Sequence, residues 1–197
     1  MKKYRLVLAS ASPRRTELLD MLGVSFDVRP ASVDESLPDN ILPETAVEML
    51  ARKKAAATPA DEDEIIIAAD TMVSADGILL GKPADKADAV RMLGMLSGRV
   101  HDVFTGVALA CGNEIYSKTV KTSVEFRKLS DEETENYVEN VNVLDKAGAY
   151  GIQGRAAVFV RKIDGDYYNV VGLPLCTLSE MLSERFGMSL CSFAEDR

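Results

Sequence analysis

The sequence feature that most constrains the fold is an uninterrupted apolar run, Ile65–Ala69, that follows an acidic turn. It opens with β-branched residues and does not alternate with polar ones, which is typical of a strand covered on both faces of a sheet. An α/β fold is therefore expected. The run ends at Asp70. Because α/β proteins place ligand chemistry at the carboxyl ends of buried strands, Asp70 is a candidate catalytic or metal-binding residue. An aspartate that only begins a turn is the alternative.

A second strand is predicted at Leu6–Ala9, and the residues after it favour the start of a helix. Ser12 is a favourable N-cap, and Pro13 suits the first helical position, where its missing N–H is not needed. The N–H groups and dipole of a helix N-terminus favour an anion. Arg14 and Arg15 add guanidinium groups suited to phosphate. The stretch predicts either a phosphate site or an ordinary strand, turn and helix with two solvated arginines.

The spacing of apolar residues predicts a helix over 43–58 with an inward-facing lysine. Val47 and Leu50 define its buried face, and Lys54 shares that face because it follows them at helical spacing. A lysine on an inward face is unusual unless it is paired or extends its ammonium to water. Lys54 is therefore a candidate to reach a phosphate or a carboxylate, whereas Lys53 is the ordinary exposed neighbour.

A further cation is predicted beside Asp70. Residues 74–77 form a hairpin-type turn between the strand that leads away from Asp70 and a returning strand, Ile78–Leu80. Because a hairpin brings its two ends together, we expect Lys82 to lie near Asp70, as a phosphate site would require. An isolated surface lysine is the alternative.

Two loops have distinctive compositions. Residues 31–42 carry three acids, Glu35 among them, and are most simply interpreted as a solvated acidic loop. Residues 145–154 hold three glycines at three-residue spacing, which indicates backbone held close to another group. Gln153 in that loop can donate and accept hydrogen bonds at once, which suits the edge of a nucleobase. A tight structural loop is the alternative.

The remaining elements complete a single predicted domain over residues 1–197, with two lobes as an alternative arrangement. A loose tail is expected over 188–197. Further helices are predicted at 85–96, 131–139 and 175–182, strands at 24–29, 103–110 and 115–126, and a last hairpin with strands at 158–163 and 167–171.

Composition excludes several classes of function. The net charge of -8 argues against broad binding to nucleic acid or an anionic membrane, but not against a local phosphate site. No apolar run approaches the ~18 residues of a membrane span, and the N-terminal apolar segment is too short for a signal peptide. Three widely spaced cysteines are typical of a reduced, cytoplasmic protein. His101, the only histidine, is interpreted as structural or surface, so the chemistry is expected to rest on carboxylates, lysines and arginines.

Five stretches of the chain carry a resemblance to a known family. They are Ser10-Ala11-Ser12-Pro13-Arg14-Arg15, Ala69-Asp70-Thr71, Gly81-Lys82-Pro83, Asp145 to Gly154 and Val170-Val171-Gly172-Leu173-Pro174. Together they resemble the Maf family, formerly called septum formation proteins and regarded as nucleoside triphosphate pyrophosphatases, from about Leu6 to Leu182. The resemblance implies an elongated α/β domain with a mixed, bent sheet and helices around a cleft, similar to the inosine-triphosphatase fold. It also implies a divalent cation, Mg²⁺ or Mn²⁺, and a homodimer.

The resemblance also assigns roles to individual residues. The family's acidic and basic active-site positions fall on Glu35, Lys54, Asp70 and Lys82. The counterpart of Asp70 is assigned as the proton acceptor. Arg14, Thr71 and Gln153 match the positions that separate the subfamilies. These three residues resemble the subclass that prefers dTTP and UTP over methylated guanosine triphosphate.

The residues suggest a mechanism as a hypothesis. Asp70, together with Glu35, binds the cation or activates the water that attacks the α-phosphorus. Lys54, Lys82 and Arg15, with the helix N-terminus at Ser12, hold the triphosphate and stabilise the leaving pyrophosphate. Two alternatives remain: a pyrophosphatase for other modified nucleotides, and a nucleotide-binding regulator of septum formation and cell division that acts without turnover.

Overall fold

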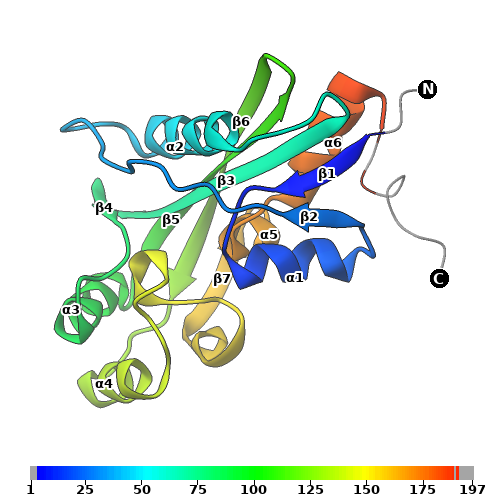
Figure 1. Cartoon of the computed structure of the whole chain (residues 1–197). Coiled ribbons are helices and arrows are strands. Elements are labelled where there is room, and N and C mark those ends of the chain that lie inside the picture. The colour runs from blue at the N-terminus through cyan, green and yellow to red at the C-terminus, as the bar shows by residue number, and fades with distance from the viewer. Residues whose placement is uncertain (1–3, 189, 191–197) are drawn as a thin grey trace. The chain divides into compact units, whose positions relative to one another are not determined.

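The computed structural model describes residues 4–188 and 190 (Figure 1). One mixed sheet has the strand order β2-β1-β3-β5-β6-β7, with β4 paired to β3. Helices flank the sheet, so the predicted mixed α/β class is confirmed. The strands are β1 (Arg5–Leu8), β2 (Phe26–Val28), β3 (Glu64–Ala75), β4 (Ile78–Leu80), β5 (Val100–Cys111), β6 (Glu114–Phe126) and β7 (Val160–Asp164). The helices are α1 (Pro13–Met21), α2 (Pro43–Ala57), α3 (Lys86–Leu96), α4 (Asp131–Asn140), η1 (Ala147–Ala149), η2 (Gly154–Phe159), α5 (Tyr167–Val171) and α6 (Leu175–Phe186).

The chain divides into two compact units. Unit 1 comprises the described residues of Met1–Asp70, Thr105–Val120 and Gly172–Arg197. Unit 2 comprises Thr71–Phe104 and Lys121–Val171. No helix in the described part of the chain is long and apolar enough to cross a membrane.

The sheet of unit 1 is parallel at its centre. Strand β1 pairs in parallel with β2 and with β3. Its register with β3 runs from Arg5 opposite Glu64 to Leu8 opposite Ile67. Both strands are buried on both faces, since each residue of Leu6–Leu8 and Ile65–Ala69 is at most 1% exposed. This confirms the central strand predicted from the uninterrupted apolar run.

Helix α2 packs very closely on the sheet of unit 1, along β3 in Figure 1. Its inner face presents the small residues Ala51 and Ala55 to a core that includes Ile66. At Gly106 of β5 the approach is closer still, because an added Cβ would lie 2.3 Å from the carbonyl oxygen of Val47. Helix and strand are therefore in backbone contact at this point, which fixes how closely α2 approaches the sheet.

Unit 2 contains the predicted β3–β4 hairpin. Val73 pairs with Leu80 and Ala75 with Ile78, in antiparallel register. The turn residues Asp76 and Gly77 both have positive φ, as a two-residue hairpin turn of this hand requires. Helix α4, which packs against α3, begins with a capping box built from Ser130 and Glu133.

His101 is a structural residue of unit 2, as the sequence suggested. It is 2% exposed, and its Nε2 lies 2.8 Å from the hydroxyl of Tyr150. Its ring packs edge-on against Phe126, with centroids 4.9 Å apart. Burial lowers the pKa of His101 to about 4, so the imidazole is neutral near pH 7.

Some sequence predictions are wrong. Residues 167–171 form helix α5 instead of a strand, because Asp166 Oδ1 accepts a hydrogen bond from Tyr168 N, 2.7 Å away, as a helix cap does. Asn169 is fully buried and donates through Nδ2 to Thr122 Oγ1. Most of the predicted tail, 188–197, lies outside the described residues.

Candidate active site

Lys54 places its ammonium between two carboxylates of unit 1. Its Nζ lies 2.6 Å from Asp70 Oδ1 and 2.7 Å from Glu35 Oε1. The side chains of Lys54 and Asp70 are only 13% and 12% exposed, whereas that of Glu35 is 51% exposed. Lys54 therefore faces inward, as its helical spacing predicted, and its partners are carboxylates. The arrangement joins helix α2, strand β3 and the loop between β2 and α2.

The three side chains come from segments that differ in structure and burial. Asp70 belongs to the buried part of β3, and Lys54 extends from the face of α2 that packs on the sheet. Glu35 belongs to the predicted acidic loop, where Asp34 accepts hydrogen bonds from both N and Oγ of Ser36. Lys53 Nζ also contacts the Asp34 carbonyl oxygen, at 3.4 Å. Glu35 is therefore both partly solvated, as the acidic-loop interpretation predicted, and paired with Lys54.

Arg15 links the loop after β1 to the segment before α6 within unit 1. Its Nε donates to the carbonyl oxygen of Gly172, 2.7 Å away, and its Nη1 donates to Ser10 Oγ at 3.1 Å. Ser10 Oγ also accepts from Ser12 N. Burial lowers the pKa of Arg15, and the negative charge of Asp70 opposes that shift. Sequence reasoning suggested a phosphate role for Arg15 and missed this positioning role. In the sequence, the only indication of this role is that Ser10 and Gly172 both lie in the stretches that carry the family resemblance.

The start of α1 differs in one detail from its prediction. Ser12 occupies the N-cap position and Pro13 the first turn, as expected, but the Ser12 side chain makes no capping hydrogen bond. The backbone N of Ser12 is instead held by Ser10 Oγ, 3.2 Å away. Arg14 follows on the first turn of the helix and is half-buried.

The other predicted site residues belong to unit 2. Thr71 follows Asp70 in β3, and Lys82 follows the end of β4. Continuing the hairpin register by two residues places Lys82 opposite Thr71. Gln153 is exposed at the N-cap position of η2. The expected proximity of Lys82 to Asp70 stays a prediction, because the two residues belong to different units.

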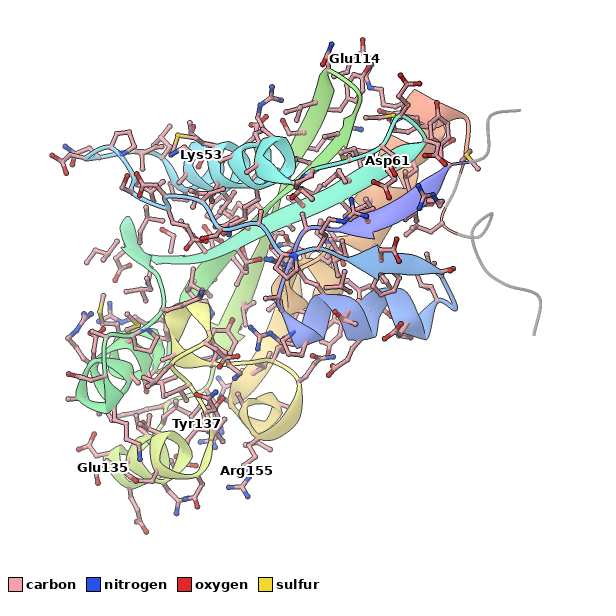
Figure 2. The ribbon with its side chains drawn as sticks, viewed as in Figure 1. Lys53, Asp61, Glu114, Glu135, Tyr137 and Arg155 are labelled. Atoms are coloured by element: carbon pink, nitrogen blue, oxygen red, sulfur yellow. The ribbon has the colours of Figure 1, made fainter. Side chains whose placement is uncertain are left out.

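The glycine-rich loop is held against the β3–β4 hairpin of unit 2. Gly148 N donates to the carbonyl oxygen of Gly81, 3.0 Å away. An added Cβ on Gly148 would meet Val73 Cγ2 at 2.9 Å, and its φ of 67° also favours glycine. Gly151 N donates to the hydroxyl of Tyr137 on α4, labelled in Figure 2. The predicted close approach is therefore confirmed at Gly148, whereas Gly154 has open space beside it and only its φ of 81° favours glycine.

The charged cluster formed by Glu35, Lys54 and Asp70 does not by itself form a complete metal site. Among residues 4–188 and 190, no group of three or more His, Cys, Asp or Glu side chains is arranged to hold a metal ion. Glu35 and Asp70 together offer two carboxylates.

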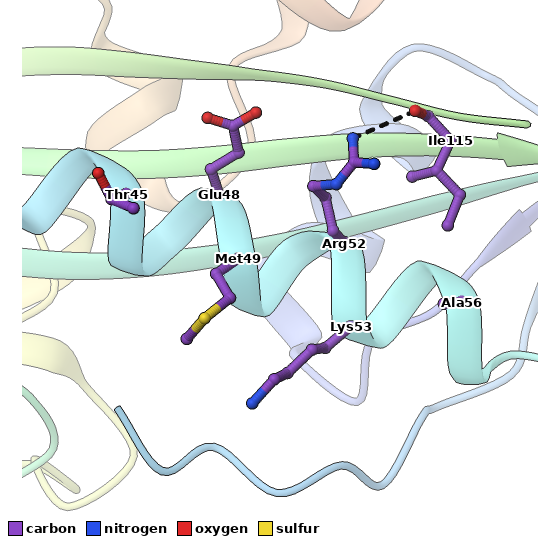
Figure 3. Close-up of a pocket in the computed structure, with 7 residues that line it drawn as sticks. All are labelled: Thr45, Glu48, Met49, Arg52, Lys53, Ala56 and Ile115. Atoms are coloured by element: carbon purple, nitrogen blue, oxygen red, sulfur yellow. Dashed lines mark hydrogen bonds between the residues drawn. The ribbon is translucent and has the colours of Figure 1, made fainter. Parts of the chain in front are cut away.

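A separate pocket of about 480 Å³ lies on the outer side of α2 (Figure 3). Arg52 crosses it and donates through Nη1 to the carbonyl oxygen of Ile115. Lys53 lines this pocket, whereas Lys54 extends from the inner face of the helix toward Asp70. Its lining residues are Thr45, Glu48, Met49, Arg52, Lys53, Ala56 and Ile115.

Comparison with known proteins shows which chains this one is similar to. The family described as "Maf-like protein" matches residues 5–185. A protein of Alkaliphilus metalliredigens named dTTP/UTP pyrophosphatase is 50% identical over 94% of this chain and 98% of its own length. A protein of Symbiobacterium thermophilum with the same name is 51% identical over 91% of this chain and 93% of its own.

The similarity to a solved structure is weaker. A HAM1 protein from Coxiella burnetii is 18% identical, with a TM-score of 0.38 over 62% of this chain and 73% of its own, which is too low to bear on the fold. The family match and the two relatives each span almost the whole chain, including the lysine and carboxylates of the charged cluster. The chain therefore belongs to the Maf family.

Proposed function

We propose that this protein hydrolyses dTTP and UTP to the nucleoside monophosphate and pyrophosphate, and so removes these nucleotides from the cellular pool. The observation that carries the proposal is the Lys54 ammonium held between Asp70 and Glu35. A half-buried cation beside two carboxylates provides both a proton acceptor and a phosphate-binding charge. Relatives at about 45–51% identity over more than 90% of the chain are named dTTP/UTP pyrophosphatases, which supports the same assignment.

The cofactor of this proposed reaction is a divalent cation, Mg²⁺ or Mn²⁺. Mg²⁺ prefers oxygen ligands and is usually bound by one or two carboxylates together with substrate phosphates. Glu35 and Asp70 supply two carboxylates and no third acidic ligand lies with them among the described residues, so this donor set fits a cation that shares its coordination with a triphosphate. When bound, the cation would neutralise charge on the phosphates.

Asp70 is proposed to accept the proton of the water that attacks the α-phosphorus. The bond between the α-phosphorus and the bridging oxygen breaks, and pyrophosphate leaves with the electron pair. Lys54 and Lys82 would stabilise the charge that develops on the leaving group. Arg15 would help to hold the triphosphate at the start of α1, where Ser12 occupies the N-cap position.

Base selectivity is proposed to depend on Arg14, Thr71 and Gln153. Gln153 carries both a donor and an acceptor, which matches the mixed edge of a uracil or thymine ring. We also propose that the protein is a cytoplasmic homodimer that does not bind nucleic acid. Support comes from the family resemblance, from the wide spacing of the three cysteines, and from the net charge of -8.

The test is pyrophosphate release with Mg²⁺ or Mn²⁺ from dTTP, UTP, CTP, the common purine triphosphates and 7-methyl-GTP. Rapid turnover of dTTP and UTP alone is the expected result. Turnover of other triphosphates instead would support the alternative pyrophosphatase. Nucleotide binding without release from any of them would support the regulator of cell division.

Asp70→Asn provides the matched variant for this assay. It keeps the size of the side chain and its contact with Lys54 but removes the proton acceptor. We expect kcat to fall by about 10³-fold or more, since a general base contributes ~10²–10⁴ in rate. Unfolding in urea should show that the fold is retained. Activity within tenfold of the unmodified protein would remove Asp70 from the central role.

A further inference from the structure

We infer that Lys54 competes with the divalent cation for Glu35 and Asp70, so that the nucleotide-free protein excludes the cation and accepts it only together with a triphosphate. The inference rests on the proposed function for the identity of that triphosphate. Its physical basis is the position of one ammonium group, which already occupies the space between the two carboxylates.

The distances show that both partners would need the same two carboxylate oxygens. Lys54 Nζ lies 2.6 Å from Asp70 Oδ1 and 2.7 Å from Glu35 Oε1, at the short end for charge-assisted hydrogen bonds. A Mg²⁺ ion that bridged the same oxygens would lie ~2.1 Å from each of them. It would therefore compete with the ammonium nitrogen for these two oxygens, and the two positive charges would repel each other.

The small number of protein ligands also indicates that the site does not bind a free divalent cation. The protein supplies two carboxylates at this site, and among the described residues no third acidic, histidine or cysteine ligand completes a cation site. An octahedral cation would take its other ligands from water and from phosphate oxygens. A cation bound to a triphosphate already has phosphate oxygens as ligands. A free cation would have to displace Lys54 without bringing an anionic group that could pair with the displaced ammonium.

Lys54 can make the exchange, because an ammonium at the end of a four-carbon stem rotates readily, whereas Asp70 is fixed in a buried strand. In the free protein Lys54 balances the charge of Asp70, which is 12% exposed and would be costly to leave unpaired. When the nucleotide arrives, its phosphates offer Lys54 an equivalent partner. The carboxylate is therefore never left without a cation during the exchange.

The test measures Mn²⁺ affinity by electron paramagnetic resonance on the full chain without nucleotide. Lys54→Met removes the competing ammonium and should bind Mn²⁺ about tenfold more tightly or better, since a charge in contact with the site is removed. Lys53→Met is the matched control, because it removes the same charge one residue away, from a side chain that contacts the Asp34 carbonyl oxygen. That variant should change the affinity by less than about threefold, since its charge is exposed and screened. Equal affinity in the Lys54→Met variant and the unmodified protein would overturn the inference.

A second measurement does not depend on any variant. Adding dTTP with a methylene group between its α- and β-phosphorus atoms should tighten Mn²⁺ binding to the unmodified protein about tenfold or more beyond the affinity of the analogue alone. Tight Mn²⁺ binding in the absence of nucleotide would refute competition by Lys54. Failure of the proposed function is seen separately, as no pyrophosphate release, and would leave the Mn²⁺ result with Lys54→Met standing.

Discussion

Gly106 offers a direct test of how packing positions the proposed active site. A Cβ added to this residue would lie 2.3 Å from Val47 O and 2.5 Å from Val47 C, both backbone atoms of α2. Ordinary contact begins near 3.4 Å. Gly106→Ala therefore requires a displacement of about 1 Å, and because the obstacle is backbone, rotation of a side chain cannot relieve it. Helix α2 must move away from β5, and Lys54 must move with it.

This displacement is expected to affect both the free energy of unfolding and the catalytic rate. Overpacking of this kind destabilises a fold by ~1–3 kcal/mol, which exceeds the ~0.4–1 kcal/mol that a Gly→Ala change returns by restricting the unfolded chain. Displacing a positioned group by ~1 Å can cost ~10² in rate. We therefore expect Gly106→Ala to lower the free energy of unfolding by ~1–2 kcal/mol and kcat/KM for dTTP by about 100-fold, or ~2.7 kcal/mol in transition-state stabilisation.

The assay pairs urea unfolding with pyrophosphate release. Gly94→Ala is the control, because Gly94 lies in α3, where an added Cβ would meet nothing within 4 Å. That change should stabilise the protein by up to ~1 kcal/mol through helix propensity and leave the activity unchanged. If Gly106→Ala were as stable and as active as the unmodified protein, backbone contact between α2 and β5 would not control the position of Lys54.

The remaining predictions concern pH dependence and base selectivity. Burial lowers the pKa of His101 from 6.5 to about 4, so between these pH values the unfolded chain binds a proton that the native chain does not. The His101 contribution to stability should therefore be complete above pH 6.5 and fall by about 3 kcal/mol as the pH is lowered to 4. Urea unfolding across this range should show a flatter profile for His101→Gln, and an identical slope would contradict the reasoning. Gln153→Glu should raise KM for dTTP and UTP selectively, because an acceptor-only group replaces one that donates and accepts. Steady-state kinetics over the nucleotide panel measure this, and an unchanged profile would argue against base recognition by Gln153.

The sequence by itself determined the local elements and the direction of several side chains. The run Ile65–Ala69 specifies a doubly buried strand, because only such an environment accepts apolar residues at every position. Helical periodicity directs Lys54 inward, and Asp76-Gly77 specifies the turn after β3. These outcomes follow from short-range rules, in which burial and backbone geometry depend on neighbours within a few residues.

Only the tertiary structure decided what these side chains meet. Glu35 and Asp70 converge on one ammonium from a loop and a strand, and Arg15 bonds to Gly172, 157 positions away. Tertiary contacts also decide α5, whose aromatic and β-branched residues favour a strand but are held as a helix by Asp166 and by the buried Asn169. The backbone contact at Gly106 also leaves no trace in periodicity. Such contacts depend on how distant segments pack, and a local pattern encodes which face is buried but not what lies against it.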